Sequence, residues 1–239
     1  MERVGSTKLW SFLDGSVAAT ETTNGKVRTD AGREVQSYLE LAARVAELQY
    51  RNRNHVLFFR GQLQDWKSAK GFTTLEPTIF RPQAGKSKLS SSEIQSRYDK
   101  LLKAEELLSE GFSFLKKLGR QRVARERLLR WSIFQHYEVC ATPLLDVTHS
   151  LRITANAEGG LQVIRLASVC PPAAIRPHIQ EGYLLGEYPE MIGITQQKHY
   201  KPYEMDFGRR VIAKFRFNPA SFWRGRNFPQ ISKTVRVLI

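Results

Sequence analysis

The pattern of apolar residues changes once along the chain, near Tyr137, from helical spacing to short strand-like runs. This order limits the folds that the chain can adopt. Before that point, apolar residues recur at helical spacing, first over residues 35–48 and then over 92–137, where we expect breaks near Gly111 and Gly119. After it, short apolar runs alternate with turn residues, which is typical of strands. Helices first and strands mostly afterwards favour an α+β fold, with a helical N-terminal half and mixed or antiparallel sheets, over a doubly wound fold.

The strand-like runs are short. Residues 55–62 are apolar and aromatic and end beside a glycine, which predicts one buried strand before the long helical region. Four later strands are expected at residues 144–148, 161–166, 192–195 and 210–217. We expect the first two of these four to be joined through a turn at Gly159 and Gly160. Ser92 and Gln95 resemble a capping box, which predicts the start of the long helix.

Composition along the chain suggests how it divides into domains. Residues 1–34 mix small and polar side chains, and we expect a loose lead-in, with a short strand at most, to a single domain over residues 35–239. Such a chain can bury a sizeable core without disulfides, so Cys140 and Cys170 are expected to be reduced thiols. No apolar run reaches the ~18 residues of a membrane span, and we expect no signal peptide. We therefore expect a cytoplasmic protein with no membrane partner.

The formal net charge of +14 is the strongest compositional signal. An excess of this size attracts polyanions, which are RNA, DNA or an acidic protein such as an antitoxin, although it can also serve solubility alone. Residues 196–239 carry ten basic and two acidic side chains, interleaved with Phe and Trp, and residues 86–130 carry twelve and six. We expect the nucleic-acid contacts at Arg209, Arg210, Arg224 and Arg226. Alternatively, the phenylalanines of this tail belong to the core of a sheet.

Several common functional motifs are missing from the sequence. No glycine-rich dinucleotide fingerprint follows an expected strand, and no phosphate-binding loop ends in Lys-Ser or Lys-Thr. The five histidines and two cysteines do not have zinc-ligand spacing. We therefore expect no metal site.

Polar groups within or beside apolar strands mark four segments of the chain. They are Phe59-Arg60-Gly61-Gln62, Leu75-Glu76-Pro77 with Arg81, Gln135-His136-Tyr137 followed by residues 144–150, and residues 175–183. An arginine at the end of an apolar strand cannot stay buried and unpaired. Arg60 therefore either pairs internally, with Asp146 as the candidate, or faces a cleft where its guanidinium binds an anion or a ribose.

In this order and rough spacing the segments resemble the FRG domain, a family named after its Phe-Arg-Gly strand. The matching residues are Phe59 to Gln62, Leu75, Pro77, Arg81, Gln135 to Tyr137, Leu144 to Thr148, Gln180 and Gly182. The resemblance covers about residues 35–195. The chain departs from the family at residues 138–143, which lack its Gly and Arg, at Val147, where the family has Trp, and at the polar residues 153–160.

The family's layout is similar to the ADP-ribosyltransferase fold, and this resemblance implies an enzyme that uses NAD as a substrate. The implied NAD-binding residues are Arg60, Gly61, Gln62, Tyr137 and Asp146. The implied catalytic residues are Arg60, His136, Thr148, Ser150, Gln180 and Glu181, with Gln180 or Glu181 acting at the ribose. On this reading Arg60, Thr148 and Gln180 should meet in one cleft, with His136 and Asp146 nearby.

Each of these residues also has a structural explanation. His136 can cap or pack at a helix end, Asp146 can cap a turn, and Thr148 and Ser150 can be ordinary strand positions. Gln180 and Glu181 can simply be exposed.

Together, charge and resemblance predict an ADP-ribosyltransferase toxin of a defence or toxin–antitoxin system that modifies RNA or DNA. Two alternatives remain open at this point. One is a metal-independent nuclease that uses His136, and the other is a nucleic-acid-binding module without catalysis, in which aromatic residues of the tail stack on bases.

Overall fold

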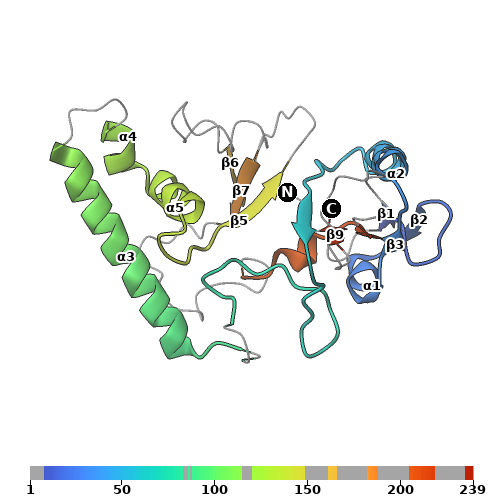
Figure 1. Cartoon of the computed structure of the whole chain (residues 1–239), viewed down its shortest axis with the longest axis horizontal. Helices are drawn as coiled ribbons and strands as arrows, with labels where there is room; N and C mark the ends of the chain where they lie inside the picture. The colour runs from blue at the N-terminus through green and yellow to red at the C-terminus, as the bar shows by residue number, and fades with distance from the viewer. Residues whose placement is uncertain are drawn as a thin grey trace. The chain divides into compact units, whose positions relative to one another are not determined.

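The structure of the chain is a computed structural model, and it is described for residues 8–82, 86, 88–114, 120–148, 161–165, 182–187, 205–218 and 235–238. The chain forms two compact units, each described here by itself (Figure 1). Unit 1 comprises Met1–Leu75, Leu151–Ala155 and Phe207–Ile239, and unit 2 comprises Glu76–Ser150 and Asn156–Asp206.

Unit 1 contains two small sheets and short helices. Its elements are β1 (Leu9–Ser11), β2 (Thr20–Thr22), α1 (Asn24–Thr29), β3 (Arg33–Glu34), α2 (Tyr38–Arg51), β4 (Arg60–Gln62), the 3-10 helix η3 (Phe207–Arg210), β8 (Lys214–Phe217) and β9 (Val235–Leu238). Strands β1 and β2 form an antiparallel pair. The other sheet has the order β3-β8-β9-β4, in which β3 and β8 are parallel and the remaining pairs antiparallel.

Helix α2 begins at Tyr38, three residues after the start of the helical run expected from residue 35, and Ser37 caps it. The Ser37 hydroxyl accepts a hydrogen bond of 3.2 Å from the Glu40 N–H, and the Glu40 carboxylate accepts one of 2.9 Å from the Gln36 N–H. These bonds satisfy donors that a helix N-terminus otherwise leaves unpaired. The bond from the Gln36 N–H, and then the Arg33 side chain, lower the pKa of Glu40.

The core of unit 1 joins the two ends of the chain. Leu9, Phe12 and Val27 are each 1% exposed, and they share unit 1 with Phe215, which is fully buried. The rings of Phe12 and Phe215 lie 5.8 Å apart. Residues 8–34, expected as a loose lead-in, are therefore an ordered part of unit 1, because their few large apolar side chains enter a core that the C-terminal residues complete.

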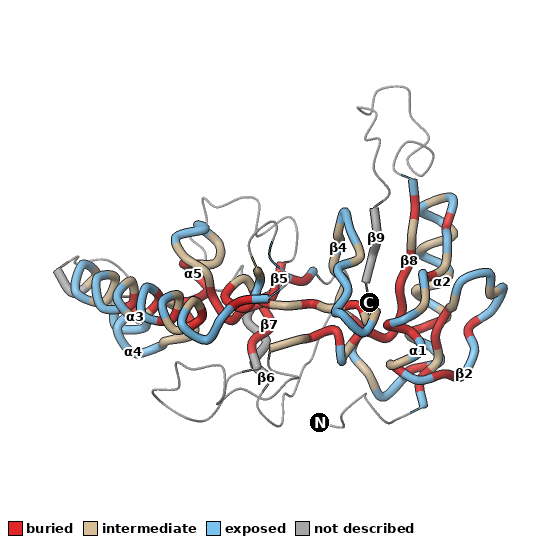
Figure 2. Tube along the Cα trace, turned by 90° about the horizontal axis from the view of Figure 1, so that it is seen from below, coloured by how far each residue is buried: buried red, intermediate tan, exposed pale blue. Residues whose placement is uncertain are grey.

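The aromatic side chains of the tail are buried where the structure describes them. Phe207 is 1%, Phe215 0% and Phe217 7% exposed, and Figure 2 shows β8 as a largely buried strand. Of the two interpretations of the tail, the sheet core is therefore correct for these three residues. Phe222, Trp223 and Phe228 lie outside the described residues.

Strand β4 is shorter than the expected run of residues 55–62, since it spans only Arg60–Gln62. Val56 is 50% exposed, so the first half of the run is not a buried strand. At the sheet edge, β4 pairs only with β9, and this short ladder limits its length. Likewise, the run expected as a strand from 210 to 217 contains the end of η3 and only the four residues of β8.

In its described residues, unit 2 has three helices and a three-stranded antiparallel sheet. Its elements are α3 (Ser91–Phe114), α4 (Arg120–Arg125), α5 (Arg127–His136), β5 (Leu145–Thr148), β6 (Leu161–Arg165) and β7 (Gly182–Glu187). Helix α3 continues through Gly111, where a break was expected, and α3 and α4 lie on either side of residues 115–119. The N-terminal cap of α3 is formed by Ser90 and Glu93 rather than Ser92 and Gln95. The Ser90 hydroxyl accepts a hydrogen bond of 3.2 Å from the Glu93 N–H, and the Glu93 carboxylate accepts one of 2.9 Å from the Ser90 N–H.

The sheet of unit 2 has the order β5-β7-β6, so β5 and β6 do not pair with each other as the expected connection suggested. Strand β7, which the residue pattern did not reveal, lies between them. The core beneath includes Tyr98 and Leu101 of α3, Trp131 and Phe134 of α5, and Leu144. The expected strand at residues 192–195 and the turn at 159–160 lie outside the described residues.

The mixed helix and strand content with small sheets confirms the α+β class. Among the helices described, none combines the length and the apolar character needed to cross a bilayer.

Candidate functional site

The side chain of Gln135 connects the end of α5 to β5 in unit 2. Its Nε2 donates a hydrogen bond of 2.7 Å to Asp146 Oδ2, and its Oε1 accepts one of 2.5 Å from the Thr142 hydroxyl. Thr142 is fully buried, whereas Asp146 is exposed. The amide therefore holds an exposed carboxylate of β5 in a fixed position relative to the helix.

A second set of bonds attaches the loop of residues 76–81 to the same place. The Thr142 N–H donates to Thr78 Oγ1 at 2.9 Å, and the Ile79 N–H donates to the Thr142 carbonyl at 3.1 Å. Two of the four motif segments found in the sequence, one at residues 75–81 and one that includes residues 135–137 and 144–148, thus meet in one polar cluster. This is the candidate site.

Two arginines bond to this loop, Arg81 from within it and Arg97 from α3. Arg97 Nη1 lies 2.8–3.0 Å from the carbonyl oxygens of Thr78, Ile79 and Arg81, so it stabilises the loop. Arg81 donates from Nε and Nη2 to the Glu76 carbonyl, at 3.2 and 2.8 Å. Its Nη1 makes no hydrogen bond to the residues described. The edge of the guanidinium formed by Nε and Nη2 is therefore held by the Glu76 carbonyl, and the edge at Nη1 is open.

The electrostatics of the cluster combine one cation with several carboxylates. Desolvation lowers the pKa of Arg81, opposed by the nearby charges of Asp146 and Glu76. Desolvation also raises the pKa of Glu76, and Asp206 raises it further, while Arg81 and Lys88 act in the other direction. A carboxyl group whose pKa is raised by burial beside a charged partner is a recognised feature of functional sites.

The expected site residues of unit 2 lie at or near this cluster. His136 is the last residue of α5 and is half-buried, and its ring meets the ring of Tyr137 edge-on at 4.9 Å. Tyr137 is 56% exposed. Asp146 and Thr148 share the exposed face of β5.

The remaining expected residues are in unit 1 or outside the described ranges. Arg60 and Gln62 are half-buried and Gly61 is exposed, all on β4, while in η3 Arg209 is exposed and Arg210 half-buried. Ser150, Gln180, Glu181, Arg224 and Arg226 lie outside the described residues. Because Arg60 and Thr148 belong to different units, the expected common cleft, and the pairing of Arg60 with Asp146, stay predictions.

Sequence reasoning did not choose Glu76, Arg81, Gln135 or Thr142 as site residues, although three of these four fall within the motif segments. The signal that could have found them is the presence of charged and amide side chains in each segment. Hydrogen bonds between distant segments bring these residues together. The bond from the Thr142 N–H to Thr78 spans 64 residues of sequence, and local spacing cannot reveal such a contact.

Within the ranges described, no three His, Cys, Asp or Glu side chains are grouped so as to hold a metal ion. The described charged side chains of the cluster are one cation, Arg81, and two carboxylates, Asp146 and Glu76. Comparison of the chain with family models, with curated proteins and with solved structures found no match.

Proposed function

We propose that this chain is an ADP-ribosyltransferase of the FRG type that takes NAD as donor and a nucleic acid as acceptor. The observation that carries the proposal is the polar cluster of unit 2, where Arg81 lies within electrostatic reach of Asp146 and Glu76. The motif segments that resemble the FRG family supply these residues. The charge of +14 supports a polyanionic acceptor.

The chemistry asks for the kinds of groups that this cluster contains. Transfer breaks the bond between nicotinamide and ribose, forms a bond from the ribose to an acceptor nucleophile, and releases nicotinamide and the acceptor proton. Positive charge develops on the ribose, and a fixed carboxylate such as Asp146 stabilises it. The free edge of Arg81 suits the pyrophosphate, and Glu76, with its raised pKa, suits the acceptor proton.

The biological setting belongs to the same proposal. A basic enzyme that modifies nucleic acid is harmful to its own cell, so we propose a cytoplasmic toxin of a defence or toxin–antitoxin system that an acidic antitoxin neutralises. The ADP-ribosyltransferase-like fold is part of this proposal and rests on the order of the motifs.

Incubation with NAD labelled in its adenylate phosphate, together with mixed RNA, DNA and protein, tests the activity. Label should become resistant to washing in a nucleic-acid fraction, and digestion with ribonuclease, deoxyribonuclease or protease identifies the acceptor. Arg81→Ala and Asp146→Asn should each lower transfer by roughly 100-fold, which is typical for loss of one electrostatic contact to a transition state. Arg60→Ala tests whether the arginine of β4 contributes as well.

Arg122→Ala is the matched control for Arg81→Ala, because Arg122 is exposed on α4 and bonds only to Glu126 within the described part of the chain. Its transfer rate should equal that of the wild type. The absence of any heat of NAD binding at millimolar ligand would contradict the proposal. Cleavage of unlabelled RNA or DNA in the same tubes would instead support the nuclease with His136.

A further inference from the structure

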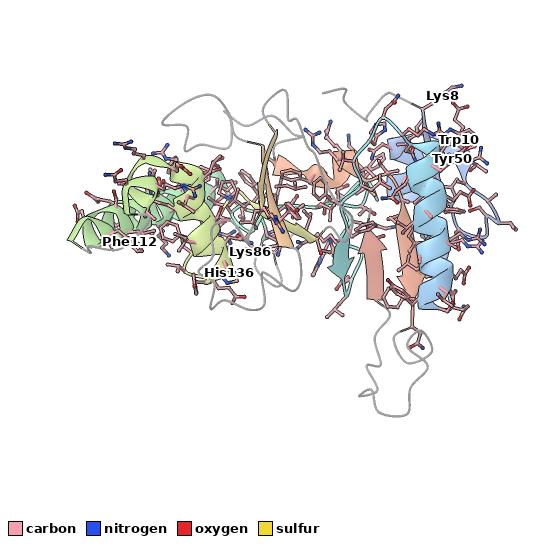
Figure 3. The ribbon with its side chains drawn as sticks, turned by 90° about the horizontal axis from the view of Figure 1, so that it is seen from above. Lys8, Trp10, Tyr50, Lys86, Phe112 and His136 are labelled. Carbon is pink, nitrogen blue, oxygen red and sulfur yellow. The ribbon has the colours of Figure 1, made fainter. Side chains whose placement is uncertain are left out.

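The C-terminal end of α2 and the strand β1 together present arginine, lysine and aromatic side chains in unit 1. We call this the α2-end surface and define it by Lys8, Trp10, Tyr50, Arg51 and Arg53. Figure 3 shows Lys8, Trp10 and Tyr50 at the same end of α2. Tyr50 is 65% exposed, the three cationic residues are exposed, and Trp10 is half-buried.

A buried asparagine holds the two parts of this surface together. Asn52 is 5% exposed, its Oδ1 accepts a hydrogen bond of 3.0 Å from the Trp10 N–H, and its Nδ2 donates one of 3.0 Å to the Trp10 carbonyl. Nδ2 also donates to the Leu48 carbonyl in α2 at 2.9 Å. Because both backbone groups of Trp10 are bound, β1 cannot slide along α2, and the surface is organised before any ligand arrives.

Each aromatic ring of the surface has a guanidinium group over it. Arg51 Cζ lies 4.6 Å from the centre of the Trp10 ring, and Arg53 Cζ lies 4.3 Å from that of Tyr50. Arg53 Nε also donates to the Tyr50 carbonyl at 3.2 Å. In the described ranges no carboxylate lies within ion-pair distance of Arg51 or Arg53, so their charge is available to an outside anion.

Lys8 adds a third cation to the surface. It pairs with Glu21 at 3.4 Å, and the two side chains are 75% and 47% exposed. An ion pair this exposed is weak and opens readily when a phosphate competes for the lysine.

We propose that the α2-end surface binds a single-stranded nucleic acid, with bases stacked on Tyr50 and Trp10 and phosphates held by Arg51, Arg53 and Lys8. Proteins that bind single strands combine aromatic platforms with cations that follow the backbone, and both are present here at one helix end. Charge complementarity alone would also suit an acidic protein, but such a partner makes no use of the exposed Tyr50 ring beside Arg53. A duplex is disfavoured because its bases are already stacked on each other.

This proposal deepens the proposed function by placing the acceptor strand, and it rests on that function only for the strand's role as acceptor. Binding itself requires no NAD. A measurement without NAD therefore separates failure of this surface from failure of the transferase chemistry.

Fluorescence anisotropy with labelled oligouridine and oligothymidine of about 12 nucleotides tests the surface. Tyr50→Ala should weaken binding by roughly 5- to 100-fold, the range for loss of one stacked base. It should leave binding to an abasic oligomer of the same length unchanged, because that oligomer has phosphates and no bases. The double variant Arg51→Gln with Arg53→Gln should make the slope of log affinity against log salt less negative by about 1.4, because each lost phosphate contact changes this slope by ~0.7.

The matched control for the double arginine variant is Arg122→Gln with Arg125→Gln, which removes the same charge from exposed positions of α4. It should retain the affinity and salt dependence of the wild type. Equal losses of affinity in the two double variants would overturn the proposal, because binding would then depend only on the net charge of the protein. Binding to polyglutamate as tight as to the oligonucleotides, and insensitive to Tyr50→Ala, would also overturn it and indicate an acidic protein partner. The Tyr50→Ala protein can also be tested for transfer of label to nucleic acid at a subsaturating concentration of acceptor. A rate equal to that of the wild type would contradict a role for this surface in acceptor binding but would agree with the proposed transferase activity.

Discussion

The ammonium group of Lys214 lies 3.3 Å from a carboxylate oxygen of Asp65, and both side chains are buried, at 1% and 6% exposure. Lys214 Nζ also donates to the Thr73 hydroxyl at 2.9 Å and to the carbonyl oxygens of Arg28 and Asp30. Burial lowers the pKa of Lys214, and Asp65 opposes the change. A buried cation with this many acceptors is a structural centre that ties β8 to the N-terminal part of unit 1.

Replacing this lysine tests its structural role. Lys214→Met should lower the free energy of unfolding by about 3–5 kcal/mol, because Asp65 would remain buried without its partner. Urea denaturation measures the change. Lys67→Met is the control, since Lys67 is 40% exposed and 4.0 Å from the same carboxylate, and it should cost little. Equal losses for the two lysines would contradict this assignment.

Glu105 should matter far more to stability than its neighbour Glu106. The Glu105 side chain is 6% exposed and joins α3 to α5 through Arg127 and Arg130, at 3.1 and 3.2 Å. Glu105→Gln should destabilise the protein by roughly 3 kcal/mol, because two largely covered guanidinium groups lose their counter-charge. Glu106→Gln removes only an exposed pair with Lys103 and should change little. Thermal unfolding of the two variants side by side decides the matter, and similar melting temperatures would refute it.

Stability should fall as pH rises because of Glu76. Folding raises the pKa of this carboxyl above its ordinary 4.5, chiefly by desolvation. The folded state therefore binds the proton more tightly, and the stability it contributes is present below that value and lost as pH rises through the folded pKa. Glu76→Gln cannot lose a proton, so the wild type should lose stability relative to it over this window. Denaturation of both proteins from about pH 4 to pH 8 provides the test, and a constant difference would contradict the pKa shift.

The start of α3 distinguishes two serines that are two residues apart. Ser90→Ala should destabilise by about 1 kcal/mol, because the Ser90 hydroxyl accepts the Glu93 N–H. Ser92→Ala should have a much smaller effect, since Ser92 makes only an exposed contact between hydroxyls, of 3.0 Å, with Ser90. Helix content by circular dichroism and urea denaturation measure both.

The Ser90 cap should also weaken in acid. Lys86 and Ser90 lower the pKa of Glu93 to about 2. The stability from these bonds is therefore present above the ordinary value of 4.5 and lost as pH falls toward 2. An effect of Ser92→Ala equal to that of Ser90→Ala would instead favour the cap expected from the sequence.

Local patterns predicted α2 to α5 but not α1, which lies within the residues expected as a loose lead-in. The apolar spacing of residues 35–48 corresponds to α2, and the long helical region corresponds to α3, α4 and α5. The alternation in residues 144–148 corresponds to β5, whose residues are alternately buried and exposed. Periodicity and capping act within a few residues, so a sequence can show them directly.

The candidate site was predicted only in part. Asp146, His136, Tyr137 and Thr148 were expected, and they lie at or near the cluster because their segments are local features of one helix end and one strand. Arg81 and Glu76 acquired their significance from the fold, since their perturbed pKa values come from burial and from charges that other segments supply. Desolvation of a side chain cannot be read from its neighbours in sequence.

What the sequence determined by itself is the class of the fold, the regions that contain the longer helices and the excess of positive charge. What only the tertiary structure decided is which distant segments meet. Strand β7 separates β5 from β6, and Phe215 packs on Phe12 across nearly the whole chain. The Asn24 side chain donates to the Val211 carbonyl at 2.6 Å, 187 residues away. Such contacts form because buried polar groups must find partners and apolar side chains must share one core, and many alternative pairings satisfy the same local pattern. The physical reason is thus that local spacing limits the shape of each segment, whereas the free energy of burial selects its partner.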